Sequence, residues 1–467
     1  MLPLLLIAGL IAIVGYAGML RHGGATAGLL ITLVAGTVLG YPFFHKDIGP
    51  IPITIDRILL ATLLVAGAVW IRTGELRLPT WRRTDTAMVV LMFVLVASCI
   101  LVVEGSERVP ALAQLVFFYG IPCAAYFIAR CTVVTPARAR AILGVLTGLG
   151  LYLAVTAILE TQGGAALVWP RFITQATFEE FLGRARGPLL SPIGNGIFLI
   201  ACGVAMATFL DSEHRARALV LVGATLVAAA AIAMTKTRSV WLAAAAAVTI
   251  LPFAYIPRRV AVAWTLLLIS AAAAVGGLEW DRILSFKRDR NVSASQVKES
   301  AELRPILAAV ALKMFADEPL VGCGFNQYSD AAKPYYGDRS VNLPLEKARP
   351  YIQHNVFLSL LTETGLTGLG AFVILLGLAF ADSWRLVRTC RRGTAFHSLA
   401  VVSIAAWIAY VVNGMFHEVA VISMSNFLLF SLWGWTESAL EYETSSSESG
   451  VESWPQPAQP LSSFPSL

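Results

Sequence analysis

The feature that most limits what this chain can fold into is a series of long apolar runs. A helix of about 17 to 25 apolar residues is long enough to cross the hydrocarbon core of a bilayer. Lipid offers no hydrogen-bond partner to exposed peptide groups, so such segments are expected to cross as helices. The runs lie at 2–20, 25–43, 57–72, 86–103, 110–130, 140–158, 189–210, 217–235, 239–256, 260–277, 366–383, 398–414 and 420–436.

The composition supports the same conclusion. With 57% hydrophobic and only 14% charged residues, a soluble protein of 467 residues could not bury this much apolar surface. The opening run, MLPLLLIAGLIAIVGYAGML, lacks a basic segment and a small-residue cleavage site, so we expect a retained span rather than a signal peptide. We predict an all-α, polytopic membrane helix bundle of about 12 to 13 transmembrane helices in a lipid bilayer.

Positive charges predict how the spans are oriented. Arginines gather in alternate short loops, around residue 21 and at 72–83, 130–140, 215–217, 258–259 and 385–392. Loops rich in Lys and Arg usually stay on the cytoplasmic side of the membrane. The intervening loops, including 45–50 and 104–108, are therefore predicted to face the outside.

Two long loops and a polar tail complete the predicted organisation. The larger loop is expected to be external and partly helical, and the Ser-, Pro- and Glu-rich tail has the composition of a disordered cytoplasmic end. The predicted parts are N-terminal transmembrane helices (1–158), central helices preceded by the first external loop (159–277), the large external loop (278–365), C-terminal transmembrane helices (366–436) and the tail (437–467).

Several classes of function are not indicated by the sequence. The six cysteines are scattered without a CxxC pair, so neither a zinc site nor a disulfide framework is predicted. No GxxxxGK[ST], HExxH, GxSxG or DxD motif occurs, which argues against nucleotide-dependent and metal-dependent chemistry of the common kinds. The net charge of +6 comes mostly from short loops between spans, so no nucleic-acid partner is expected.

The stretch QHNVFLSLLTETGLTG (353–368) contains the strongest candidate for chemistry. His354 stands where an apolar helical run leads directly into a span, whereas the other five histidines stand at span ends. An imidazole with a pKa near ~6.5 can accept a proton from a hydroxyl nucleophile. Asn355 can cap the helix or bond a hydroxyl, and Gly365 and Gly368 can let the chain turn into the membrane. The alternative interpretation is that His354 is only a polar residue at a helix start.

Arginines on the predicted outer side form a second group of candidates. Charged side chains at a membrane boundary are costly unless they reach water or bind something. Arg184 and Arg186 precede a span in GRARGPLLSP, where the alternative role is an interfacial anchor. Arg238 lies with Lys236 in TKTRSVW, where the charge rule would place no positive residue. These positions predict an anionic partner on the outside.

Arg304 is a further candidate from the large loop. In ELRPILAAVALKMF we expect Arg304 to begin a helix with Pro305 in its first turn, since apolar residues follow at helical spacing. A guanidinium beside a helix N-terminus is a favourable place for phosphate, although a solvated charge on a surface helix is the alternative. Nucleoside triphosphates are not expected outside the membrane, so a donor there must arrive activated, as a lipid-linked diphosphate does.

These segments resemble the O-antigen ligase and polymerase family of bacterial inner-membrane proteins. The family's hallmark is a histidine, then Asn, Ser or Gln, nine residues, a glycine, two residues and often another glycine. Here it reads His354, Asn355, VFLSLLTET, Gly365, LT, Gly368. DEPLVGCGFNQY (317–328) is similar to the family's stretch upstream of the histidine. RARGPLLSP and TKTRSVWLA are similar to its two arginine motifs, and the resemblance spans roughly 180–430.

The resemblance implies a helical, multi-pass glycosyltransferase of the bacterial inner (cytoplasmic) membrane with its active site facing the periplasm. Members transfer a glycan from an undecaprenyl-diphosphate carrier to a hydroxyl acceptor, such as the lipid A core of lipopolysaccharide or another glycan, without cofactor or metal. Carried over, His354 would activate the acceptor hydroxyl with Asn355 beside it. Arg186, Arg238 and Arg304 would bind the diphosphate. Arg184 could take the place of Arg186, and a single displacement implies inversion at the anomeric carbon.

Two alternatives stay open at this stage. Ligase, polymerase and protein-glycosylating relatives are not separable by these motifs. From another class, a transporter or flippase for an anionic or lipid-linked solute would also suit a helical bundle with external arginines. It would predict ionisable residues at mid-span and interrupted helices there, whereas the charges here gather on one external side.

Overall fold

The computed structural model describes residues 2–48, 51–76, 78–177, 181–208, 215–285 and 294–449, and its regular structure is almost entirely helical. The elements are α1 (Leu2–Val38), β1 (His45–Ile48), β2 (Ile51–Thr54), α2 (Ile55–Thr73), α3 (Arg83–Ala97), α4 (Arg108–Leu115), α5 (Ile121–Cys131), α6 (Pro136–Thr161), α7 (Pro192–Thr208), α8 (Arg215–Met234), α9 (Arg238–Ile250), α10 (Pro252–Tyr255), α11 (Arg258–Ser285), α12 (Ala294–Asp317), α13 (Tyr328–Ala331), α14 (Val356–Thr389), α15 (Ala395–Gly414) and α16 (Ser423–Ser449). Short helical turns are η1 (Ser98–Val102), η2 (Gly105–Glu107), η3 (Val116–Gly120), η4 (Ala165–Leu167), η5 (Arg171–Thr174), η6 (Lys333–Gly337), η7 (Leu345–Ala348) and η8 (Val419–Val421).

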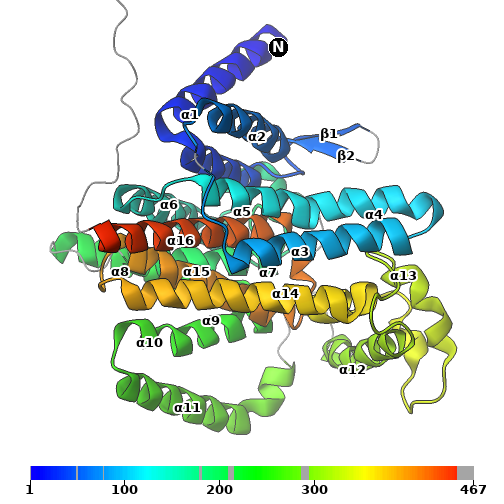
Figure 1. Cartoon of the computed structure of the whole chain (residues 1–467). Coiled ribbons are helices and arrows are strands. Elements are labelled where there is room, and N and C mark those ends of the chain that lie inside the picture. Colours follow the sequence, from blue (N-terminus) through cyan, green and yellow to red (C-terminus); the bar gives the residue numbers. More distant parts are fainter. Residues whose placement is uncertain are drawn as a thin grey trace, which may run out of the picture.

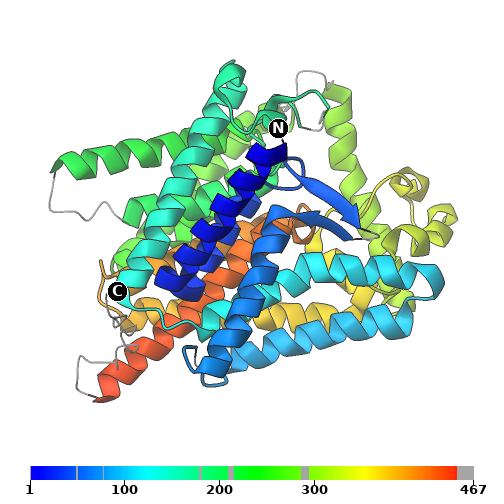
Figure 2. The ribbon, with the colours of Figure 1, turned by 90° about the horizontal axis from the view of Figure 1, so that it is seen from above.

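The long helices lie side by side in a bundle (Figure 1). α16 packs against α5, α14, α15 and α7, and its large side chains, among them Phe427, Phe430, Trp433 and Trp435, are almost completely buried. The helices of the large loop, α12 and α13, gather at one end of the bundle beside the start of α14, and the perpendicular view shows them at the same end (Figure 2). We call this the α12 end of the bundle.

The helical prediction is confirmed, because each of the thirteen apolar runs lies mostly within a helix. Within the described residues, six helical stretches are long and apolar enough to cross a membrane. They are Arg83–Val102, Gly105–Cys131, Pro136–Thr161, Arg238–Tyr255, Val356–Thr389 and Ala395–Gly414. Gly23–Val38, Pro192–Thr208 and Val222–Met234 are shorter apolar helices. The fold is therefore an all-α polytopic bundle, with one small hairpin, β1–β2, in the loop around 45–54.

The predicted tail begins later than expected. α16 continues to Ser449, so residues 437–449 are helical, and Glu437 and Leu440 are buried against the bundle. The polar composition of this stretch suggested disorder, but one face of the helix carries partners for the N-terminal helices. Residues 450–467 of the tail and 286–293 of the large loop lie outside the described residues.

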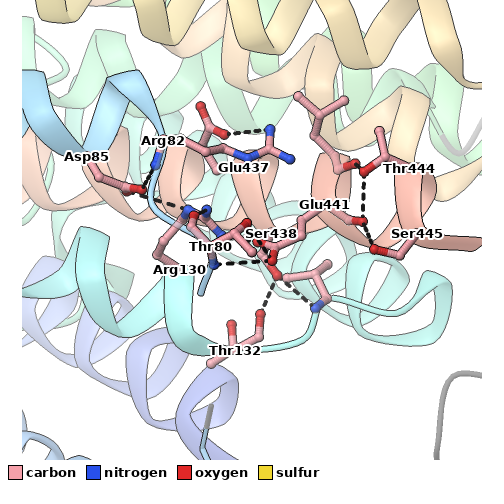
Figure 3. Close-up of polar contacts among 12 residues, drawn as sticks. Thr80, Arg82, Asp85, Arg130, Thr132, Glu437, Ser438, Glu441, Thr444 and Ser445 are labelled. Atoms are coloured by element: carbon pink, nitrogen blue, oxygen red, sulfur yellow. Dashed lines mark hydrogen bonds and ion pairs between the residues drawn. The ribbon is translucent and has the colours of Figure 1, made fainter. Parts of the chain in front are cut away.

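Those partners form a buried ion network at the end opposite α12 (Figure 3). Arg130 of α5 lies 2.6 Å from Glu441 and 3.5 Å from Asp85, measured between nitrogen and carboxylate oxygen. Arg82 lies 3.2 Å from Glu437 in the same way. The side chains of Arg130, Asp85 and Glu437 are at most 2% exposed. The network therefore joins the N-terminal helices α3 and α5 to the last helix, α16.

Removing the central cation should weaken this junction strongly. Arg130→Ala would leave buried carboxylates without their counter-ion, a change that typically costs about 3 to 5 kcal/mol of unfolding free energy. We expect a large fall in the melting temperature of the detergent-purified protein. Arg140→Ala removes the same charge from an exposed position of α6 and should leave it nearly unchanged. Equal melting temperatures for the two variants would contradict a structural role for the network.

Candidate functional site

The two segments that surround the predicted base form one backbone-bonded unit. The N–H groups of Cys323 and Gly324 donate to the carbonyl oxygens of Thr362 and Glu363, both at 2.9 Å. The N–H group of Leu366 donates to the carbonyl oxygen of residue 319, also at 2.9 Å. The stretch 317–328 therefore lies directly against the first turns of α14. Two motifs that are separate in the sequence are a single structural element.

Glycines allow the two backbones to approach this closely. Gly365 has φ of +64°, and a Cβ atom there would lie 2.3 Å from the carbonyl of Leu320. Gly322 has φ of +66°, and its Cβ atom would lie 2.5 Å from the backbone of Thr362 and Glu363. Only glycine meets both demands at low cost. As predicted, Gly365 marks a change in chain direction, and α14 is broken there.

A buried carboxylate fixes the loop that follows. Glu363 accepts a hydrogen bond from the N–H group of Asn326 at 2.9 Å and is only 7% exposed. The next contact is made by Phe325, whose N–H group donates to the Ser98 hydroxyl at 3.0 Å. The bond to Ser98 connects the motif segments to η1, directly after α3. The unit is thus held from the side of the bundle as well as from its own backbone.

His354 is presented by this unit immediately before α14. Its φ is +48°, an uncommon conformation for a residue with a side chain. Asn355 is the N-cap, because its side chain accepts from the N–H groups of Phe357 and Leu358 at 2.9 and 3.1 Å. The capping role considered for Asn355 is therefore confirmed. The strained backbone at His354 is the kind of conformation that persists when the surroundings impose it, often at functional sites.

The surroundings of His354 favour its neutral form. Its ring is partly buried, stands 6.3 Å from the Tyr351 ring between centroids, and forms no hydrogen bond within the described part of the chain. Burial lowers the pKa of His354 below its ordinary value, and the positive charge of Arg304 lowers it further. A neutral imidazole near pH 7 can accept a proton. Arg304 and Asn355, the residue after His354, bind two consecutive residues, Phe416 and Met415, so Arg304 lies in the same region as His354.

Arg304 corrects one sequence-based expectation. α12 begins at Ala294, so Arg304 and Pro305 lie inside the helix and the guanidinium is not beside a helix N-terminus. The helix tolerates the proline because only one backbone donor is lost, while Ile306 and Leu307 are buried beyond it. Arg304 instead donates to the carbonyl oxygen of Phe416 at 3.1 Å and stacks over that ring at 5.3 Å.

The loop between α15 and α16 organises this region. Besides Arg304, it binds Asn355, whose amide donates to the carbonyl oxygen of Met415 at 2.9 Å. Ser359 donates to the carboxylate of Glu418 at 2.8 Å. Burial raises the pKa of Glu418 above its ordinary value. We call residues 415–422 the connecting loop, since it contacts both α12 and the first turn of α14.

The second group of candidates lies in the loops before α7 and α9. Arg186 is fully buried, lies 3.4 Å from Glu160 between Nε and Oε1, and donates to the carbonyl oxygen of Ile173 at 2.6 Å. Arg184 is also buried and donates to the carbonyl oxygen of Thr235 at 3.2 Å. The contacts shown for these two arginines are with the protein's own groups, so they hold the 159–188 loop in place.

Arg238 occupies the first turn of α9 and is only partly buried. The residues before it are bonded to the other arginine motif: Arg184 donates to the Thr237 hydroxyl, and Lys236 donates to the carbonyl oxygen of Gly183 at 2.8 Å. The two arginine motifs therefore form one cluster. The connecting loop links this arginine cluster to the region of His354 and Arg304. Its Ile422 side chain lies 3.1 Å from the position that a Cβ atom on Gly194 of α7 would occupy.

The direction of the helices places both groups toward the same end. α9 runs from Arg238 to α10, which lies at the end of the bundle opposite α12 (Figure 1). The start of α9 is therefore directed toward the α12 end, as is the start of α14. Among the described residues, no group of three or more His, Cys, Asp and Glu side chains is placed to hold a metal ion.

Residues 223–373 match the family model described as O-antigen ligase. This segment belongs to the O-antigen ligase family. It contains Arg238, Arg304, His354 and both glycines of the hallmark, so the predicted family is confirmed. The match covers about a third of the chain, and Arg184 and Arg186 lie before it. No curated protein sequence matches the chain closely.

Sequence reasoning missed three contributors to this candidate site: Ser359, Glu363 and Glu418. The signal for Glu418 was available, because a carboxylate between two apolar spans is costly unless it has a partner. Glu363 stands inside the hallmark itself, among the nine residues whose identity the hallmark does not specify. Ser359 lies one turn beyond the Asn355 cap, which gave no reason to single it out.

The close approach at Gly365 gives a direct test of the unit. Gly365→Ala introduces both an unfavourable positive φ and a clash with the backbone of Leu320, so we expect a loss of at least about 2 kcal/mol of unfolding free energy. Gly370→Ala is the matched control in the same helix, since beyond its chain neighbours and the backbone of its own helical turns no atom lies within 4 Å of its Cβ position. Melting temperatures in detergent should separate them. Equal melting temperatures for the two variants would show that the close backbone approach at Gly365 does not constrain the structure.

Proposed function

We propose that this protein is a membrane glycosyltransferase that moves a glycan from an undecaprenyl-diphosphate carrier to a hydroxyl acceptor at the periplasmic face of the bacterial inner membrane. The observation that carries the proposal is the presentation of His354, with positive φ and a lowered pKa, by the O-antigen ligase motifs beside Arg304. The charge rule supports the orientation, because the arginine-rich loops 258–259 and 385–392 lie at the end opposite α12.

The arginines are proposed to bind the diphosphate of the donor. Arg238 and Arg304 are partly exposed and suit direct contact with phosphate oxygens. Arg184 and Arg186 are buried, so their contribution is proposed to be the positive field of the cluster and the placement of the loop that carries Arg238. Guanidinium groups oriented before the reaction stabilise the charge that grows on the leaving diphosphate.

The proposed step is a single displacement. The acceptor oxygen forms a bond to the anomeric carbon, and the bond from that carbon to the diphosphate oxygen breaks with its electron pair. The acceptor's proton passes to a ring nitrogen of His354, and the configuration at the anomeric carbon inverts. Asn355 positions His354 by capping α14 and binding the connecting loop. We propose that the reaction needs no metal.

His354→Ala should abolish glycan transfer while leaving expression and membrane insertion intact. The assay uses purified protein, an undecaprenyl-diphosphate-linked oligosaccharide and a hydroxyl acceptor, and it follows product and released diphosphate carrier. Loss of the base typically costs about 10²- to 10⁴-fold in rate. His45→Ala, in the exposed β1–β2 hairpin, is the matched control and should keep full activity.

Two further readouts come from the same assay. Activity should persist in EDTA, and loss that is restored by added metal would overturn the metal-free step. The product separates the family members, since a single glycan joined to a lipid A core indicates a ligase and a ladder of growing chains indicates a polymerase. Full activity of the His354→Ala variant would remove this residue from the role of base.

The pH dependence tests the pairing of His354 with Arg304. The rate should rise with pH as His354 loses its proton, with a midpoint below about 6.5, since the pKa is lowered in the folded protein. Arg304→Gln removes the nearby positive charge, so the pKa of His354 rises and the midpoint should move to higher pH. Arg339→Gln, an exposed charge in the same large loop, should leave the midpoint in place. An unmoved midpoint in the Arg304 variant would contradict the pairing.

A further inference from the structure

A cavity lies at the end of the bundle opposite the candidate site. It has a volume of about 550 Å³ and is lined by residues of α10, the start of α11, the end of α14 and the turn that follows α14. Arg258, Arg388 and Arg392 are among its lining residues. Arg388 and Arg392 come from one segment, the end of α14 and the turn after it, and Arg258 comes from the start of α11, so the fold brings charges from two distant segments together.

The cavity is strongly positive. Within the described residues, Arg258, Arg388 and Arg392 form no ion pair with a carboxylate. Burial raises the pKa of the lining Cys390 to about 11, and the negative charge of Glu443 contributes to this rise. By contrast, Arg130 at the same end of the bundle is neutralised by buried carboxylates.

The position of the cavity matches the headgroup level of a bilayer. Beyond Arg258, α11 exposes apolar side chains to its surroundings: Val260 is 53% and Leu266 60% exposed. On the other wall, Arg388 lies 5.8 Å from the centroid of the Trp384 ring, in the last turns of a helix long and apolar enough to span. Tryptophan and arginine near a span end usually rest where hydrocarbon meets headgroups.

We propose that this cavity binds the phosphate group of an anionic phospholipid from the surrounding membrane. Guanidinium groups form paired hydrogen bonds with phosphate oxygens, and basic pockets between transmembrane helices suit lipid headgroups. Phe253 and Val387 add apolar wall beside the arginines, which suits the glycerol and the first acyl carbons. A free phosphate ion would use the arginines but not this apolar wall, so the lipid is the favoured source of the phosphate.

The experiment is native mass spectrometry of the full-length protein released from detergent with added lipid. Phosphatidylglycerol is the anionic probe, phosphatidylcholine is the zwitterionic control, and inorganic phosphate is the soluble competitor. The lining variant carries Arg258→Gln, Arg388→Gln and Arg392→Gln. The control variant carries Arg259→Gln, Arg385→Gln and Arg391→Gln, which removes the same charge from neighbouring exposed positions that do not line the cavity.

The wild type and the control variant should retain one phosphatidylglycerol at concentrations where phosphatidylcholine is lost. The lining variant should bind it roughly tenfold or more weakly, since each arginine near an anionic headgroup contributes attraction. Equal weakening in both triple variants, or equal retention of the two lipids by the wild type, would overturn the proposal. Displacement of the lipid by inorganic phosphate at a similar concentration would overturn the lipid as the source.

Melting temperatures of all variants in detergent establish that they are folded. Should the lining triple variant fail to fold, Arg388→Gln and Arg392→Gln are made singly and compared with Arg385→Gln and Arg391→Gln. Each lining substitution should then weaken phosphatidylglycerol binding by roughly a few-fold more than its neighbour does. Equal binding by lining and neighbouring single variants would count against the site.

Discussion

The close contact between two backbones is the constraint on which the candidate site depends. The stretch 317–324 can lie against the first turns of α14 only because Gly322 and Gly365 have no side chain. Once the backbones are that close, their peptide groups bond to each other and hold the turns of α14 around Thr362 to Leu366 in place. His354, with its positive φ, stands directly before the part of α14 that is held in this way. The histidine and the glycines of the hallmark therefore belong to one structural unit.

The matched O-antigen ligase segment depends on parts of the chain outside it. The connecting loop, beyond residue 373, binds Arg304 through Phe416 and Asn355 through Met415. Ser98, far before the segment, binds the loop after Gly324. α16 begins directly after the connecting loop, and it is joined to the N-terminal helices by the ion network around Arg130. The site is thus a property of the whole bundle rather than of the motifs alone.

Local features were predictable from the sequence, and contacts between distant segments were not. The helices followed from the apolar runs because lipid imposes both their length and their hydrogen bonding. The Asn355 cap and the break at Gly365 followed because they depend on neighbouring residues. The predicted start of α12 was wrong, because Pro305 lies in the middle of the helix, where packing offsets its local cost. The burial of Arg186 against Glu160 and the role of Glu418 required knowledge of which loops meet.

The broken helix α14 has a mechanical consequence. Directly after Gly365, the N–H group of Leu366 is bonded to the carbonyl oxygen of residue 319, so the break in α14 is anchored to the 317–328 stretch of the large loop. The longer arm, which reaches Thr389, crosses the apolar layer and must adjust its tilt to the thickness of that layer. We infer that the break at Gly365, anchored in this way, takes up the change in tilt with little displacement of the segment before it, which carries His354. The residue proposed as the base would then keep its place when the lipid around the arm changes.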